Sequence, residues 1–141
     1  MSRRWIVTGG SRGVGLAVAR AAARRGDRVA VFARKIDEAA LKAELGPECL
    51  AVPTDISERA SVDASVARVV EAWGGVDVLV NNAGLHRGGK LVRLDVADWD
   101  AVLATNLSGP MYCTRTVLPH MQPGAAIVNV GAVVGFRGFP G

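Results

Sequence analysis

The sequence is poor in cysteine, in aromatic residues and in long apolar runs, and each shortage excludes a class of protein. The two cysteines, Cys49 and Cys113, show neither metal-ligand nor redox spacing, so we predict no metal site and two buried free thiols in a reducing cytoplasm. No run of about 18 apolar residues occurs, so no membrane-spanning helix is expected. The N-terminal stretch MSRRWIVTGG has too few apolar residues for a signal peptide. The expectation is a cytoplasmic protein that does not associate with membranes.

The excess of positive charge is also small. Lysine and arginine number 17 against 13 aspartate and glutamate, a formal net charge of +4, and aromatic residues make up 5% of the chain. The arginines are scattered or paired, as in Arg3-Arg4 and Arg24-Arg25, and form no basic stripe with interleaved aromatics. Nucleic-acid binding is therefore not expected. A small phosphate-bearing molecule accounts equally well for local basic residues.

What the chain does contain is a regular alternation of strand-like and helix-like segments. Half of its 141 residues are hydrophobic and 21% are charged, which is typical of one globular domain over residues 1–141. The predicted strands cover 4–8, 28–33, 49–55, 76–82 and 125–130. The predicted helices cover 14–25, 36–45, 57–73 with Ser57 as the cap, and 98–121 with Asp98 as the cap and a kink at Pro110.

This alternation predicts an α/β fold, a Rossmann-type doubly wound parallel sheet with strand order 3-2-1-4-5. The order leaves the fifth strand at an edge, and apolar AAIVNVGAVVG makes a poor bare edge because exposed hydrophobic strands aggregate. The sheet therefore looks unfinished, without the usual C-terminal strands. Oligomerisation is expected, because this strand and the apolar side of helix 98–121 need cover.

A glycine-rich turn, TGGSRGVG at residues 8–15, joins the first strand to the first helix. Gly9, Gly13 and Gly15 let the backbone turn tightly and approach a ligand, while the helix N-terminus offers free amides to an anion. The spacing differs from the dinucleotide fingerprint G-x-G-x-x-G but has the same mechanical logic. The placement between strand and helix predicts a phosphate site.

With this turn and the motifs that follow it, the chain resembles the short-chain dehydrogenase/reductase family over its whole length. TGGSRGVG resembles the cofactor loop, Asp55-Ile56 the adenine-side acidic position, NNAG at 81–84 the motif after strand four, and Asn106 in TNLSG the active-site asparagine. IVNVGAVVG resembles the fifth strand and FRGFPG the loop before the catalytic tyrosine. The cofactor-binding positions that we predict are Gly9, Ser11, Arg12, Gly13, Val14, Gly15, Arg34, Asp55, Ile56, Asn82, Ala83 and Gly84.

The family implies an NAD or NADP cofactor, and residues beside the ribose position favour NADP. A carboxylate at the end of strand two would bind the ribose 2′-hydroxyl and repel a 2′-phosphate. Ala33 and Arg34 stand there instead, and Arg12 lies in the glycine turn. Guanidinium groups pair bidentately with phosphate, so NADP is predicted and NAD is the less favoured cofactor. The alternative is that Arg34 is only a solvated loop residue.

The catalytic groups that the resemblance implies are mostly missing. The family uses a tyrosine, a lysine, a serine and an asparagine. The serine maps to Ala132, and the tyrosine and lysine fall at positions 145 and 149, past Gly141, so only Asn106 remains. Losing an oxyanion-type donor costs about 10²–10³ in rate and losing a general acid about 10²–10⁴. We therefore expect cofactor binding with little turnover by this chain alone.

Four further polar residues each have a functional and an ordinary interpretation. His86 follows NNAG and either faces a substrate or is a plain loop residue. His120 favours the negative pole at the end of the long helix. Asn82 and Asn106 either serve the site or hold neighbouring segments together as buried amides, and in this family both interpretations apply.

Three functions remain open. The chain is part of an NADP(H)-dependent oxidoreductase that transfers hydride between nicotinamide and a carbonyl or alcohol, incomplete and inactive alone. Alternatively, it is a non-catalytic NADP-binding subunit that stabilises or regulates a catalytic partner in a homo- or hetero-oligomer with a similar chain. A nucleotide-sensing module is the third interpretation. The substrate is not predicted, because in this family it binds a C-terminal loop that the chain lacks.

Overall fold

The computed structural model describes residues 2–138, so the last residues of the FRGFPG motif lie outside it. A parallel sheet of five strands has the order β3-β2-β1-β4-β5, as predicted. The strands are β1 (Arg4–Thr8), β2 (Arg28–Ala33), β3 (Leu50–Pro53), β4 (Val78–Asn81) and β5 (Ala126–Asn129). The α-helices are α1 (Gly13–Arg24), α2 (Glu38–Leu45), α3 (Arg59–Trp73), α4 (Val96–Leu103) and α5 (Gly109–Val117).

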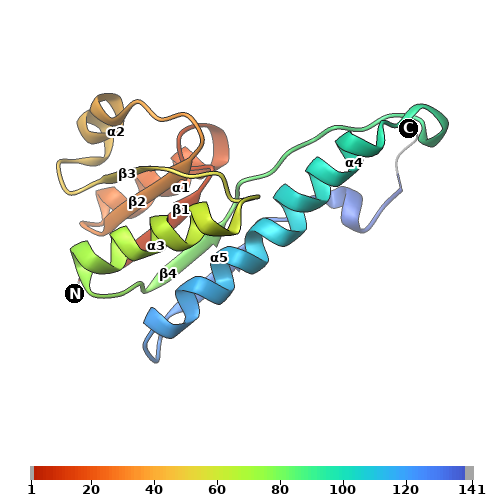
Figure 1. Cartoon of the computed structure of the whole chain (residues 1–141). Coiled ribbons are helices and arrows are strands. Elements are labelled where there is room, and N and C mark those ends of the chain that lie inside the picture. Colours follow the sequence, from red (N-terminus) through yellow and green to blue (C-terminus); the bar gives the residue numbers. More distant parts are fainter. Residues whose placement is uncertain (1, 139–141) are drawn as a thin grey trace.

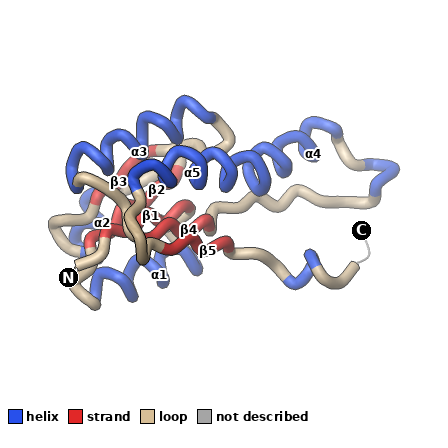
Figure 2. The backbone as a smooth tube through the Cα atoms, turned by 90° about the horizontal axis from the view of Figure 1, so that it is seen from below, coloured by secondary structure: helices blue, strands red, loops and turns tan. Residues whose placement is uncertain are grey.

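Helices cover both faces of the sheet (Figure 2). The strand side chains alternate between two apolar clusters, one on each face. Ile6 and Phe32 pack toward α3 and α5 in one apolar cluster, while Val7 and Val31 pack toward α1 and α2 in the other. All four of these side chains are fully buried. Because β1, β2 and β4 are buried on both faces, their sequences are almost continuously apolar, as parallel strands require.

The third helix begins one residue later than predicted, because Ser57 is not its cap. The Ser57 hydroxyl donates to Asp55 Oδ1 at 2.6 Å, and the Ser57 amide donates to the same oxygen at 3.0 Å. The N-cap is Glu58, whose side chain makes no capping bond. Asp55 thus recruits the serine that the sequence pattern assigned to the helix.

The predicted helix over 98–121 is wrong in its start and in its continuity. It begins at Val96, where Asp95 rather than Asp98 caps it by accepting from the Ala97 amide. A π-helical segment, Ala104–Ser108, separates α4 from α5, and the Gly109 amide donates to the Ala104 carbonyl. Pro110 stands in the first turn of α5 and has no N–H to continue an α-helical ladder through this point. The π-helical turn lies directly before this proline. Such π-bulges inside α-helices are frequent at functional sites.

The β5 edge and helix α4 are incompletely covered. Helix α4 extends away from the sheet beside the segment that follows β4 (Figure 1). On β5 and just after it, Val128 is 47% exposed and Val130 is 45% exposed. Further exposed apolar side chains on α4, on α5 and between them are Val96, Trp99, Leu103, Leu107 and Met111. In the described part of the chain, no helix has the length and apolarity to cross a membrane.

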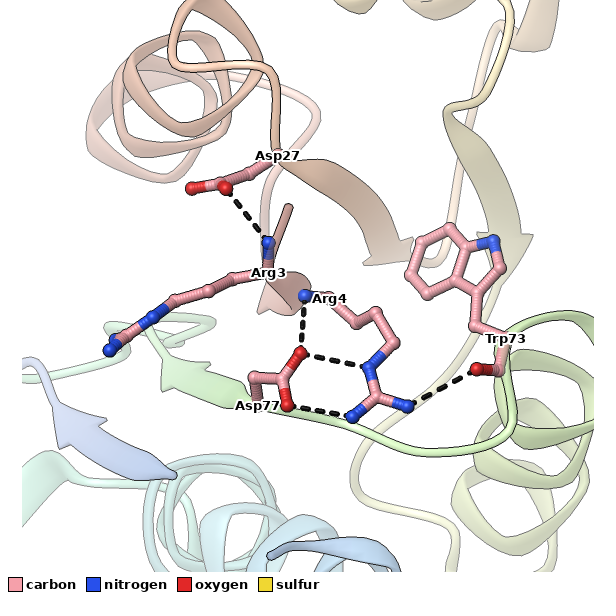
Figure 3. Close-up of polar contacts among 5 residues, drawn as sticks. All are labelled: Arg3, Arg4, Asp27, Trp73 and Asp77. Atoms are coloured by element: carbon pink, nitrogen blue, oxygen red, sulfur yellow. Dashed lines mark hydrogen bonds and ion pairs between the residues drawn. The ribbon is translucent and has the colours of Figure 1, made fainter. Parts of the chain in front are cut away.

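At the opposite end of the sheet, an ion pair ties β1 to the segment that enters β4 (Figure 3). Arg4 donates to both carboxylate oxygens of Asp77, at 2.8 and 2.7 Å, and to the Trp73 carbonyl at 3.2 Å. The Arg4 amide also donates to Asp77. The hydrogen bonds from Arg4 hold the pKa of the Asp77 carboxyl below its ordinary value, against the opposing effect of burial.

Replacing Asp77 should therefore destabilise the fold in a pH-dependent way. Because the folded-state pKa of Asp77 is lowered, its stabilisation is present above the unfolded pKa of about 3.9 and is lost as the pH falls through the folded value. Asp77→Asn should lower the free energy of unfolding by about 1–2 kcal/mol at pH 7. Urea unfolding at pH 7 and at pH 3 measures this, and the difference from wild type should shrink at pH 3.

Asp100→Asn is the matched control. Asp100 is exposed and forms no ion pair with any residue of the described range 2–138, so this change should be nearly neutral at both pH values. Equal losses in the two variants would show that the Arg4–Asp77 pair contributes nothing specific.

Candidate functional site

A cleft of about 910 Å³ opens at the carboxyl ends of the strands, where ligands bind in open α/β sheets. Four segments contribute most of its lining: the glycine turn after β1, the end of β2, the loop after β3 and the loop after β4. Every predicted cofactor-binding residue lines this cleft except Gly15, which is buried beneath the turn. The lining residues that were predicted are Gly9, Ser11, Arg12, Gly13, Val14, Arg34, Asp55, Ile56, Asn82, Ala83 and Gly84.

The glycine turn lies directly against the loop after β4. A Cβ on Gly15 would stand 2.4 Å from both Asn82 Nδ2 and the Gly9 carbonyl oxygen. A Cβ on Gly9 would stand 2.9 Å from the Ala83 Cα, and Gly9 has a φ of +65°, which L side chains rarely adopt. These two glycines are therefore required by close packing between two protein segments, whichever ligand occupies the cleft.

Thr8, at the end of β1, joins the same two segments by hydrogen bonds. Its hydroxyl accepts from the amides of Asn82 and Ala83, each at 3.0 Å, and donates to the Val80 carbonyl at 3.3 Å. The Asn82 side chain returns the contact, because its Nδ2 donates to the Thr8 carbonyl at 3.0 Å. Thr8 is 1% exposed, so these bonds lie out of water. Asn82 thus holds two segments together, the ordinary interpretation that the sequence left open.

The cleft presents positive charge and free backbone donors. Arg12, Arg34 and Lys35 line it, and all three are exposed. Helix α1 begins here, and no side chain of the described residues caps it, so its first amides remain free to bind an anion. Among the described residues, Asp55 is the one acidic residue that lines the cleft, and it follows β3 rather than β2. The end of β2 thus carries the cations Arg34 and Lys35. A carboxylate at the same place would repel a phosphate.

Asp55 itself organises the loop after β3. Its Oδ1 accepts from Ser57, and its amide donates to the Ser61 hydroxyl at 3.0 Å. Oδ2 accepts no hydrogen bond from residues 2–138. Ile56, the next residue, packs so closely on α5 that a Cβ on Gly109 would stand 2.7 Å from its Cδ1. One carboxylate oxygen thus remains free beside the cleft, while the neighbouring residue anchors the loop to α5.

Asn106 lies in the π-helical segment and holds the loop after β4. Its Oδ1 accepts from the Leu85 amide at 2.7 Å, and its Nδ2 donates to the Leu85 carbonyl at 2.8 Å. Leu85 and Thr105 line the cleft, whereas Asn106 does not. Both polar groups of the amide are therefore engaged in positioning Leu85 in this structure.

The remaining predicted positions do not converge on the cleft. Ala132 is an exposed residue just before a short 3-10 helix, Val133–Gly135, and neither lines the cleft. His86 is exposed in the loop after β4, and His120 ends the 3-10 turn that follows α5, where its carbonyl accepts from the Val76 amide. Burial raises the pKa of Cys49 to about 11 and that of Cys113 to about 12, so neither thiol is a nucleophile at neutral pH. Within residues 2–138, no cluster of three or more His, Cys, Asp or Glu side chains forms a metal site.

Sequence reasoning missed several residues that shape the cleft. The sequence predicts Thr8 only as the last residue of a strand, although its hydroxyl accepts from two amides of the loop after β4. Lys35 directly follows Arg34, and its position in the sequence could have indicated a second cation at the end of β2. The other lining residues that were not predicted as site residues are Phe32, Ala33, Thr54, Leu85 and Thr105. They carry no motif of their own and reach the cleft through the fold.

Gly15→Ala tests the close packing of the glycine turn. The added methyl group would overlap Asn82 and Gly9, so we expect a loss of about 2–3 kcal/mol in the free energy of unfolding, as for overpacked cores. Urea unfolding measures it. Gly89→Ala is the control, because nothing lies within 4 Å of that Cβ, and its effect should stay below about 1 kcal/mol. A neutral Gly15→Ala would contradict the packing described above.

Comparison with known proteins gives the same relationships in sequence and in structure. The chain is 38% identical to a 3-oxoacyl-[acyl-carrier-protein] reductase of Staphylococcus epidermidis, over 100% of this chain and 61% of the relative. It is 36% identical to a sorbitol dehydrogenase of Cereibacter sphaeroides, over 94% of this chain and 54% of the relative. The crystal structure of a short-chain dehydrogenase from Streptomyces avermitilis superposes with a TM-score of 0.93 and 32% identity, over 99% of this chain and 53% of the other.

The chain thus spans between about half and two thirds of the length of these relatives. A sequence model of the short chain dehydrogenases matches residues 3–141. The parallel sheet order, the glycine turn after β1 and the packing of that turn on the NNAG loop are consistent with this match. On these grounds the chain belongs to the short chain dehydrogenase family.

Proposed function

We propose that this chain forms the nucleotide-binding part of an NADP(H)-dependent oxidoreductase and turns over little or no substrate as the 141-residue polypeptide. When bound, the nicotinamide supplies a hydride donor or acceptor for a carbonyl or alcohol. The feature that carries the proposal is the cleft at the carboxyl ends of the strands, with its glycine turn, free helix amides and three cations.

The residues of the cleft fit a dinucleotide in size and in charge. The volume of about 910 Å³ lies in the upper part of the range for ligand pockets, about 300–1,000 Å³. The glycine turn brings backbone amides to the start of α1, where a pyrophosphate would be held. A Cβ on Gly13 would meet no atom within 4 Å, so Gly13 borders open space rather than protein.

The preference for NADP over NAD rests on Arg12, Arg34 and Lys35. All three line the cleft, Arg34 and Lys35 directly after β2 and Arg12 in the glycine turn, and no carboxylate occupies the end of β2 itself. A 2′-phosphate adds about two negative charges at this place, which guanidinium groups bind bidentately. NAD lacks that phosphate and gains nothing from the same cations. Asp55, in the loop after the neighbouring strand β3, would offer its free carboxylate oxygen to the adenine.

Proton transfer to a substrate oxygen is the step for which the described part of this chain offers the fewest suitable side chains. Its one tyrosine, Tyr112, lies on α5 among the residues packed against the core rather than in the cleft. Ala132 provides no hydroxyl, and Asn106 is engaged with Leu85. These residues support cofactor binding and positioning rather than acid–base chemistry. The substrate class stays open, since one similar protein is named for a 3-oxoacyl substrate and another for sorbitol.

A second function fits the exposed apolar surface: an NADP-binding subunit that stabilises or regulates a catalytic partner. Large apolar side chains on α4, α5 and the segment after β5 remain uncovered, including Trp99 at 53% and Phe136 at 93% exposure. Clustered exposed apolar residues are commonly covered in a protein–protein interface. A homo- or hetero-oligomer with a similar chain would provide that cover.

The cofactor preference is tested by fluorescence titration with NADPH and with NADH. Arg12→Met and Arg34→Met should each weaken NADPH binding by about 10–100-fold, because each removes a charge-assisted bond to phosphate, and should leave NADH binding almost unchanged. Arg25→Met is the control, since Arg25 follows α1 at its far end and does not line the cleft. Absence of NADPH binding to the wild-type chain would refute the proposed function.

The catalytic deficit is tested by Ala132→Ser. Restoring the hydroxyl should not produce NADPH oxidation with a 3-oxoacyl thioester or a sugar ketone, because the proton donor is still missing. Absorbance at the nicotinamide band measures the rate, with the wild-type chain beside it. Turnover by Ala132→Ser alone would overturn the assignment of position 132. A complex that co-purifies with a longer homologous chain and is active only as a complex would favour the second function.

A further inference from the structure

Asn81 is a buried polar residue in an otherwise apolar strand, and its side chain reaches two other elements. It is 4% exposed and follows Val78, Leu79 and Val80 in β4. Its Nδ2 donates to Asn129 Oδ1 of β5 at 2.8 Å and to Thr114 Oγ1 of α5 at 3.2 Å. Its Oδ1 has no partner among residues 2–138. One amide therefore links three elements, while half of its polar capacity is unsatisfied.

Burying an unpaired carbonyl oxygen is unfavourable, so this arrangement calls for a compensating role. An apolar residue at position 81 would continue the pattern of β4 and would bury no unpaired oxygen. An asparagine adds two hydrogen bonds donated by Nδ2, both directed to elements other than β4. The role of Asn81 is therefore to bind Asn129 and Thr114 by these hydrogen bonds.

Both the backbone and the side chain of Asn81 form hydrogen bonds with the edge strand β5. Asn81 and Asn129 are register partners, and the Asn81 carbonyl accepts from the Val130 amide at 2.9 Å. β5 has four residues and, among residues 2–138, pairs with β4 alone, so few other contacts specify its register. A slip by one residue would place Val128 or Val130 opposite Asn81, and neither offers a side-chain acceptor. The amide pair therefore selects one register.

The next residue, Asn82, grips the other side of the site. Its Nδ2 donates to the Thr8 carbonyl, and its amide donates to the Thr8 hydroxyl. Adjacent positions at the end of a strand direct their side chains oppositely. The Asn81-Asn82 dipeptide therefore connects the glycine turn on β1 with the edge strand β5, although β5 contributes no residue to the cleft.

We propose that Asn81 and Asn129 are positioning residues that couple the edge strand β5 to the nucleotide cleft, so that occupation of the cleft stabilises the β4–β5 pairing. The register role stands on the geometry alone, and the coupling rests on the proposed nucleotide function. Thr114 orients the shared amide from α5. Through this link the backbone at Val130, two residues before Ala132, takes a defined place beside the loop 82–85.

Amide hydrogen exchange of the free protein tests the register role. Asn129→Ala removes the acceptor from an exposed position, so the fold should survive, and exchange at the Val130 amide should become about tenfold faster. Asn129→Asp keeps a carboxylate acceptor and should restore slow exchange to within about threefold of wild type. Val128→Ala is the matched control on the same strand, and it should behave like Asn129→Asp. An unchanged rate in Asn129→Ala, or equal acceleration in Val128→Ala, would overturn the register role.

Exchange with saturating NADPH tests the coupling. In the wild type, NADPH should slow exchange both at the glycine turn and at Val130. In Asn129→Ala the slowing should persist at the turn and disappear at Val130, whereas Asn129→Asp should recover it. Equal slowing at Val130 in wild type and Asn129→Ala would refute the coupling. No slowing at the glycine turn would refute the proposed function instead, and the free-protein comparison would still decide the register role.

Discussion

Gly9 and Gly15 allow the turn after β1 to lie against Asn82 and Ala83 at distances that no Cβ on either glycine would permit. Thr8 strengthens this approach by accepting from two successive amides of the loop after β4. The glycine turn is thereby held between the ends of β1 and β4, and the amides at the start of α1 are directed into the cleft. The other parts of the site are arranged around this contact. Without it, the free amides of α1 and the cations of the cleft would have no fixed position relative to one another.

From this contact the organisation extends outward through asparagines. Asn82 holds the turn, Asn81 holds β5, and Asn106 holds Leu85 from the π-helical segment. Each amide donates to or accepts from a different neighbouring element, so the loop after β4 is held by side chains from three directions. Such polar contacts add specificity, because a shifted segment leaves them unpaired. The apolar core gives the sheet its stability but has no comparable preference for one loop position.

Much of the fold follows from local patterns. The strands at 4–8 and 28–33 coincide with β1 and β2, since a buried parallel strand is a short apolar run bounded by turn residues. The sheet order follows from right-handed crossovers. The predictions are wrong where a side-chain partner or an irregular helical turn overrides the local pattern. Ser57 was predicted as a helix cap, but Asp55 binds its hydroxyl, and the predicted helix 98–121 is interrupted where Pro110 and the π-helical turn meet.

The sequence by itself determined the alternation of elements, the glycine turn and the cations beside it, because backbone conformation and charge depend on residues close together in the chain. It also determined that no hydroxyl stands at Ala132. Tertiary structure alone decided which groups meet in the cleft and which amides are already engaged. Thr8 became the centre of the site and Asn106 a support for Leu85, because their partners lie far away in the chain. Hydrogen bonding over such separations depends on how the strands are ordered in space, and no local pattern encodes that order at the level of single atoms.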